Sequence, residues 1–102
     1  MIVLTPGHTY ELANFQHSTV QHLQFIHKEP NADNSGELVT VKEGTTNEEV
    51  LEVLIDRMQF LQSKFPCREN AIVITKLEES LMWLNKRTAD RVKRNVEGKH
   101  KS

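Results

Sequence analysis

The chain has 102 residues, 37% of them hydrophobic and 26% charged, and a formal net charge of −1. This length allows one domain with a modest core, and the near-neutral charge argues against a general nucleic-acid coat protein, which would be basic overall. The single cysteine excludes an intrachain disulfide, and neither a signal peptide nor an apolar run of membrane-spanning length is evident. We therefore expect a soluble intracellular protein with no membrane partner.

The first part of the chain predicts β-structure. Three segments rich in β-branched and aromatic residues read as strands, namely 8–15 (HTYELANF), 19–29 (TVQHLQFIHKE) and 37–43 (ELVTVKE). Between the last two, residues 30–36 (PNADNSG) are dense in residues that turn a chain. We expect residues 1–44 to form a small antiparallel meander of two to four strands.

Residues 46–97 predict a helical hairpin. Thr46 and Glu49 have the spacing of a capping box at a helix start, and Pro66 interrupts the helical periodicity that follows. A second helix begins directly after this proline and can run to Gly98. Because the break is short, the two helices should be antiparallel. The apolar stripe of the second helix comprises Ile74, Leu77, Leu81 and Leu84.

Together these elements predict an α+β protein, a single domain over residues 1–102, with few layers to cover its apolar surface. Val53, Phe60 and Trp83 are apolar helix positions beyond one stripe. Such a surplus is usually covered by a second copy of the chain. We therefore expect a homo-oligomer, with a dimer as the first hypothesis.

Several kinds of chemistry lack their motifs. The four glycines form neither a GxxxxGK[ST] nor a GxGxxG pattern, so an ATPase has no support. His17, His22 and His27 recur every five residues, a spacing that converges on neither a strand nor a helix, and we expect no metal site. Cys67 beside Arg68 could be a reactive thiol, but a weak substitute for a serine cap is the commoner role. Neither catalysis nor a cofactor is therefore expected.

Cations gather at the end of the chain. Residues 86–102 contain seven Lys and Arg against two acids, whereas the preceding residues contain six against twelve. Arg87, Arg91 and Arg94 share one helical face, and Asp90 between them could hold Arg87 or Arg94 in place. Arginine binds phosphate oxygens through two parallel hydrogen bonds, so this face would suit a nucleotide with more than one phosphate. The alternative is a solvated helix end whose cations offset the helix dipole.

Several segments of the sequence resemble those of one known family. The resemblance extends in order over most of residues 7–98, and its most specific parts are TTNEEVLEVLIDR and WLNKRTADR. Other matching segments are GHTYELANF, LQFIHKEP and ENAIVITKLEES. These segments are similar to the phage Thoeris anti-defence protein one family. The stretch KLEESLMWLNKR also looks like the hairpin of the related anti-CBASS sponge proteins, which favours an intertwined helical oligomer.

The resemblance implies an antiparallel sheet followed by a long two-helix hairpin, assembling as dimers and in some members as a hexamer of three dimers. It implies binding without chemistry: a sponge that captures the glycocyclic ADP-ribose messenger of Thoeris intact, in the cytoplasm of the infected bacterial host. Hexameric relatives also take up cyclic trinucleotides of the CBASS pathway at a separate site.

The same resemblance implies a set of ligand-binding residues. The base-stacking aromatic of the family would fall on Phe60, and its polar contact to the adenine edge on Asn70. The two arginines that hold the diphosphate would be Arg87 and Arg91, with Thr88 and Asp90 supporting them. Phe60 could instead be a core residue, and Asn70 could merely cap the helix.

A different class of function stays open beside this one. The helical hairpin could be a small interaction module that binds a protein or nucleic-acid partner through its basic end. Binding of that kind should weaken steeply with salt and should not depend on the chemistry of a messenger. On the leading hypothesis, no nucleic-acid partner is expected.

Overall fold

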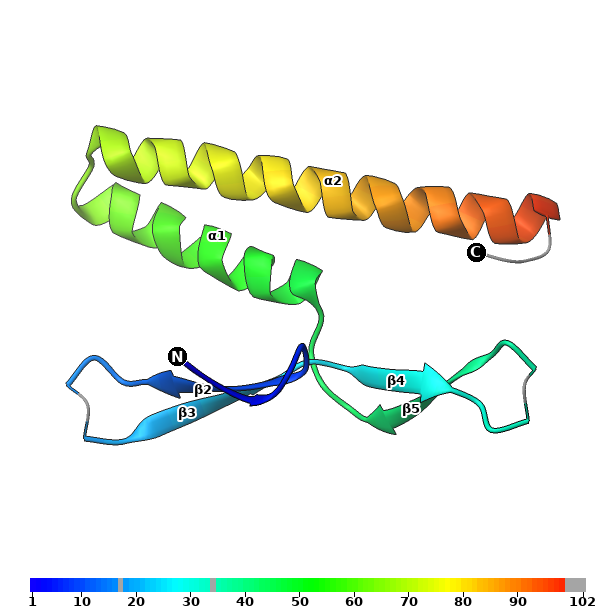
Figure 1. The fold of residues 1–102 in the computed structure, drawn as a ribbon. Coiled ribbons are helices and arrows are strands. Elements are labelled where there is room, and N and C mark those ends of the chain that lie inside the picture. The colour runs from blue at the N-terminus through cyan, green and yellow to red at the C-terminus, as the bar shows by residue number, and fades with distance from the viewer. Residues whose placement is uncertain (17, 34, 99–102) are drawn as a thin grey trace. The chain divides into compact units, whose positions relative to one another are not determined.

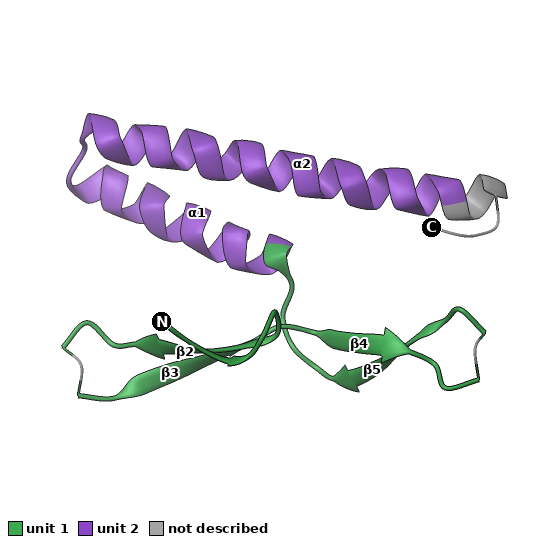
Figure 2. Cartoon of the chain, viewed as in Figure 1, with its two compact units in different colours: residues 1–47 green, residues 48–102 purple. Residues whose placement is uncertain are grey.

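The structure is a computed structural model that describes residues 1–16, 18–33 and 35–98, with side chains as far as Arg94. The chain divides into two compact units, Met1–Asn47 and Glu48–Ser102 (Figure 2). Five strands lie in the first unit and the second unit is helical (Figure 1). The predicted α+β class, antiparallel strands followed by a helical hairpin, is confirmed.

The strands form two small antiparallel sheets. The first contains β1 (Ile2–Thr5), β2 (Thr9–Ala13) and β3 (Val20–Gln24) in that order, and the second contains β4 (His27–Pro30) and β5 (Leu38–Lys42). The β2–β3 and β4–β5 hairpins extend in opposite directions from a shared junction (Figure 1).

The prediction of one strand over residues 19–29 is wrong, because the segment is divided between β3 and β4. At the division the backbone turns to other partners: Phe25 N donates to His8 O at 2.7 Å, and Ile26 N donates to Thr45 O at 2.9 Å. The expected two to four strands are likewise too few, since five are described. The prediction missed β1, although its β-branched residues precede a proline and a glycine.

Gly44 permits the close approach that joins the two sheets. A Cβ at this position would lie 2.5 Å from both the Gln24 O and the Phe25 C of the backbone. Thr45, the next residue, donates from its N to Gln24 O at 2.9 Å and pairs with Phe25 in a parallel bridge. The return of the chain towards the helices therefore requires a residue without a side chain here.

The helices begin and end close to the predicted positions. α1 (Asn47–Lys64) starts directly after Thr46, and α2 (Arg68–Gly98) starts two residues after Pro66. At the start of α2 the backbone N of Asn70 donates to Cys67 Sγ at 3.4 Å. The cysteine thus takes the place of a serine cap, as the sequence indicated.

The two helices run side by side in opposite directions (Figure 1). Gln59 Nε2 of α1 donates to Glu78 Oε2 of α2 at 3.5 Å, and Gln62 of α1 exchanges two hydrogen bonds with the backbone of Cys67 in the turn. The half-buried positions of α2 recur every three or four residues, which is the spacing of a helix–helix seam. In the part of α2 up to Leu84 they are Asn70, Ile74, Leu77, Leu81 and Leu84, and Asp90 is half-buried beyond it.

The hairpin leaves a large apolar surface uncovered. None of the described residues is fully buried, and the side chains of Val53, Phe60 and Trp83 are 62%, 58% and 57% exposed. These are the three residues that the sequence placed outside the main stripes. Exposed apolar area on this scale is typical of a surface that meets another molecule. Within the described part of the chain, no helix is both long and apolar enough to cross a bilayer.

Candidate ligand-binding site

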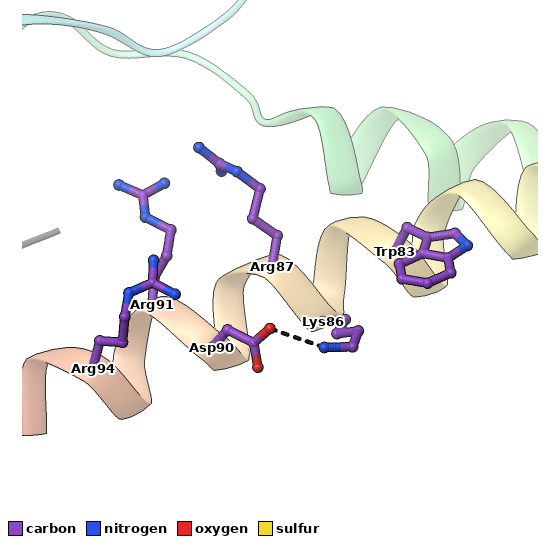
Figure 3. Close-up of a pocket in the computed structure, with 6 residues that line it drawn as sticks. All are labelled: Trp83, Lys86, Arg87, Asp90, Arg91 and Arg94. Carbon is purple, nitrogen blue, oxygen red and sulfur yellow. Dashed lines mark hydrogen bonds and ion pairs between the residues drawn. The ribbon is translucent and has the colours of Figure 1, made fainter. Parts of the chain in front are cut away.

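An open groove of about 350 Å³ follows the C-terminal half of α2. One helix supplies all its lining residues, at successive turns of its C-terminal half (Figure 3). They are Trp83, Lys86, Arg87, Asp90, Arg91 and Arg94. Four cations and one acid give the groove a formal charge of +3. This surface therefore attracts anions.

The acid in the groove is held by a lysine. Lys86 Nζ donates to Asp90 Oδ2 at 2.9 Å, an i, i+4 pair on the helix surface (Figure 3). This hydrogen bond, and after it the charge of Lys86, lowers the pKa of the Asp90 carboxyl, to which Arg94 and Lys93 contribute less. The hypothesis that Asp90 holds Arg87 or Arg94 is wrong, because its partner is Lys86.

The three arginines keep their guanidinium groups available. Arg87 and Arg91 extend from the helix in the same direction (Figure 3). Among the described residues, no carboxylate lies within ion-pair distance of Arg87, Arg91 or Arg94. A guanidinium without a protein partner can place two parallel N–H donors on a phosphate or carboxylate. Two such groups one turn apart can hold an anion with two phosphates.

Thr88 connects α2 to α1 at the level of the groove. Its Oγ1 donates to Glu48 Oε2 at 3.3 Å. This hydrogen bond joins α2, at the residue after Arg87, to the first turn of α1. Thr88 does not line the groove. Its contact links the helix that carries the arginines to α1.

Phe60 lies outside the groove, on α1. Its side chain is 58% exposed, so it is not a core residue in this chain, and Lys64 Nζ lies 5.5 Å from the centre of its ring. The ring face is thus in a position to attract a cation or a flat partner.

Asn70 also lies outside the groove, half-buried at the start of α2. Its side chain makes no hydrogen bond to the described residues, whereas its backbone N is capped by Cys67. Asn70 precedes Arg87 by 17 positions, about 26 Å along a helix. Within one chain the structure therefore brings together Arg87, Asp90 and Arg91, but it does not bring Phe60 or Asn70 to them.

Two residues of the groove, Trp83 and Lys86, were not predicted from the sequence. Trp83 entered only as surplus apolar surface, although it precedes Arg87 by one helical turn and Arg91 by two. That spacing was the available signal. Lys86 is one of several cations in this part of the sequence, and its pairing with Asp90 is seen only in the structure.

The histidines do not form a metal centre in the part of the chain that is described. No group of three or more His, Cys, Asp or Glu side chains converges there. The rings of His8 and His27 stack at 3.7 Å between centres, while His22 faces Glu11. His17 lies outside the described residues.

The fold and the groove define a class of protein: a small antiparallel β-structure followed by a two-helix hairpin whose longer helix presents a cationic face. Comparison with known families places it further. The model of the Acb2/Tad1 hairpin domain matches residues 21–89. Since this match covers more than half of the chain, the chain belongs to the Acb2/Tad1 hairpin domain family.

A relative supports the same placement. Thoeris anti-defense 1 of Bacillus phage SBSphiJ7 is 60% identical over 58 residues, which are 56% of this chain and 41% of that protein. The chain therefore matches about two fifths of the length of this curated relative. The family match includes Phe60, Asn70 and Arg87 but ends before Asp90 and Arg91.

Proposed function

We propose that the chain is a phage anti-defence protein that binds a cyclic ADP-ribose-type immune signalling nucleotide, glycocyclic ADP-ribose, and sequesters it without cleaving it. The main support for this proposal is that Arg87 and Arg91, in the cationic groove of a family member, have guanidinium groups without an ion-pair partner among the described residues. They bind the bridged phosphates of the messenger, while Thr88 holds their helix to α1 and Asp90 holds the neighbouring Lys86.

The dimensions and charge of the groove support a nucleotide of this kind. A volume of about 350 Å³ lies in the range of small-molecule sites, which is roughly 300–1,000 Å³. A diphosphate diester carries two negative charges, and two arginines can each donate a pair of hydrogen bonds to it. The third cation without a protein partner, Arg94, adds to the same field.

The binding site is completed by a second copy of the chain. Phe60 and Asn70 lie towards the turn of the hairpin, whereas the arginines lie towards its open end, so one chain cannot place all four on one ligand. An antiparallel partner hairpin would bring its own turn end to the arginine end of the first. The exposed Val53, Phe60 and Trp83 support such an assembly, a dimer or a hexamer of dimers.

The groove is suited to holding a ligand and not to breaking it. Its lining includes no histidine, cysteine or serine, and its one carboxylate is ionised and paired with Lys86. A general base or a nucleophile with an activating partner is therefore missing from the lining residues. This arrangement supports a non-enzymatic protein without a cofactor. Cyclic oligonucleotides of CBASS are a second ligand class that the family resemblance implies.

The proposal is tested by capture and release. The protein is incubated with glycocyclic ADP-ribose, separated from free ligand and denatured by heat, and the released compound is identified by mass spectrometry. We expect the intact messenger. Release of a linear or otherwise cleaved product would show an enzyme and contradict the proposal.

The site assignment is tested by the double variant Arg87→Ala/Arg91→Ala. Charge-assisted hydrogen bonds contribute about 1.5–3 kcal/mol each, so loss of both arginines should weaken capture by a hundredfold or more, roughly. The matched control is Arg57→Ala/Lys76→Ala, which removes the same charge from positions outside the groove. An equal loss of capture in both double variants would mean that the net charge of the chain, and not these two arginines, determines binding.

The alternative, an interaction module for nucleic acid, is favoured by the exposed tryptophan beside the cations. The two functions differ in their response to salt and to ligand chemistry. Nucleic-acid affinity should fall steeply between about 50 and 200 mM salt because counterions are released. Capture of the messenger should fall less and should reject linear ADP-ribose.

A further inference from the structure

Arg94 is a cation of the groove that the diphosphate of the proposed messenger leaves without a partner. The groove has a formal charge of +3, whereas a bridging diphosphate carries two negative charges. Arg87 and Arg91, one turn apart, can each donate a pair of hydrogen bonds to it. Among the described residues, no carboxylate lies within ion-pair distance of Arg94. One guanidinium group of the groove is therefore available for a further anionic group.

The three arginines follow one another along one side of α2. Arg87 and Arg94 are seven positions apart, which is nearly two full turns, and Arg91 lies between them. With a rise of 1.5 Å per residue, the Cα atoms of Arg87 and Arg94 are separated by about 10 Å along the axis. Arg94 extends towards the same side of the helix as the other two (Figure 3). Its long side chain can thus reach a group attached beside the diphosphate.

The acid of the groove does not occupy Arg94. Asp90 precedes it by one helical turn, but the carboxylate of Asp90 is hydrogen-bonded to Lys86 Nζ at 2.9 Å. The pKa of Asp90 is lowered first by this hydrogen bond and then by the charge of Lys86, and to a smaller extent by the charge of Arg94. Because Lys86 neutralises the acid, the guanidinium group of Arg94 keeps its hydrogen-bond donors.

Resting on the function proposed above, we propose that Arg94 forms a third phosphate subsite, which makes the groove prefer cyclic ADP-ribose-type nucleotides that carry an additional phosphate monoester on a ribose hydroxyl. The monoester adds up to two negative charges beside the diphosphate, and the third guanidinium group meets them. The subsite adds to the pair formed by Arg87 and Arg91 and makes no use of the nucleotide base.

Inorganic pyrophosphate and tripolyphosphate provide the first test, because they differ by one phosphate. Isothermal titration calorimetry of the wild-type chain should show that tripolyphosphate binds about tenfold more tightly. Arg94→Gln should lose most of this difference. Lys93→Gln is the matched control, since it removes the same charge from the adjacent exposed position, which does not line the groove, and it should keep the difference. If both variants lose it equally, net charge explains the preference and the inference is overturned.

The second test compares glycocyclic ADP-ribose with the same nucleotide carrying a phosphate monoester on a free ribose hydroxyl. The wild type should bind the phosphorylated form about tenfold more tightly near pH 7.5. Arg94→Gln should lose this preference, and Arg94→Lys, which keeps the charge but not the planar fork, should retain part of it. The preference should shrink as the pH falls through about 6, where the monoester takes up its second proton.

The outcomes separate this inference from the proposed function. If the wild type captures glycocyclic ADP-ribose but the added phosphate does not increase the affinity, the third subsite is overturned and the proposed function stands. The same conclusion follows if the preference survives in Arg94→Gln. Capture of neither nucleotide would contradict the proposed function and, with it, the nucleotide preference inferred from Arg94, whatever the binding of tripolyphosphate.

Discussion

The two parts of α2 have different surroundings and carry different kinds of residue. The hydrogen bond from Thr88 to Glu48 marks the level at which α1 begins. Residues 68–88, the paired segment, therefore run beside α1, and residues 89–98, the overhang, continue past its first turn (Figure 1). The paired segment has its half-buried apolar seam, whereas half of the residues of the overhang are charged.

The difference between the paired segment and the overhang shows which residues of α2 do not have to pack against α1. In the paired segment every third or fourth position must be apolar to cover α1, so its sequence is constrained on one face. In the overhang Val92 is 56% exposed and no such constraint from α1 applies. Arg91 and Arg94 belong to this part and Arg87 adjoins it. A long second helix thus lets one element join a structural seam to a cationic surface.

The largest effect is expected from removing the overhang. A chain ending at Thr88 should lose messenger capture by a hundredfold or more, roughly, because Arg91 and Arg94 are gone. The hairpin should remain folded, since its seam and its contacts to α1 are kept. Capture is measured by mass spectrometry and helicity by circular dichroism, with a chain ending at Gly98 as the control. Loss of helical structure beyond the deleted residues would refute the division of α2 into a paired segment and an overhang.

The paired segment should be the sensitive part for stability. Leu81→Ala in the seam should lower the free energy of unfolding by about 1–2 kcal/mol, less than the 2–5 kcal/mol for full burial because Leu81 is only half-buried. Val92→Ala in the overhang should change it by less than about 0.5 kcal/mol. Chemical unfolding followed by circular dichroism compares the two. Similar values for both variants would mean that something other than α1 covers the overhang.

The helices could be predicted from the sequence because their signals are local. Thr46 with Glu49, the proline at 66 and the glycine at 98 set the boundaries within a residue or two. The apolar spacing of Leu77, Leu81 and Leu84 gave the seam. These features act within one or two turns, so they can be recognised without knowledge of the rest of the fold.

The strands and the groove depend on contacts between distant residues, and there prediction was weaker. The division of residues 19–29 into two strands depends on backbone hydrogen bonds from Phe25 N to His8 O and from Ile26 N to Thr45 O. No local sequence pattern contains these contacts. The pairing of Asp90 with Lys86, instead of an arginine, depends on which of several cations reaches the carboxylate. For Phe60 and Asn70 the roles rest on the family resemblance and stay predictions.

A smaller effect is expected at the border between the two segments. Thr88→Val removes the hydrogen bond to Glu48 and should cost about 0.5–1.5 kcal/mol of stability. A double-mutant cycle with Glu48→Gln isolates this contact from other effects of each substitution. Chemical unfolding of the four chains provides the measurement. A coupling energy near zero would show that Thr88 does not fix the start of the overhang to α1.

The smallest effect concerns the acid within the cationic groove. The pKa of Asp90 is lowered, chiefly by its hydrogen bond to Lys86, so any stability it contributes is complete above its unfolded pKa and is lost as the pH falls through the lower folded pKa. The charge of the groove should therefore be constant from about pH 5 to pH 8, and messenger affinity should be flat over that range.

The substitution Asp90→Asn tests whether the paired acid tempers this field. It releases Lys86 and raises the formal charge of the groove from +3 to +4, so we expect a modest gain in messenger affinity and a steeper dependence on salt. Glu79→Gln, an exposed acid of α2 outside the groove, should change neither. A loss of affinity in Asp90→Asn, with Glu79→Gln unchanged, would mean instead that the carboxylate accepts a hydrogen bond from the ligand. Asp90 would then be a direct contact of the overhang and not only a support for its cations.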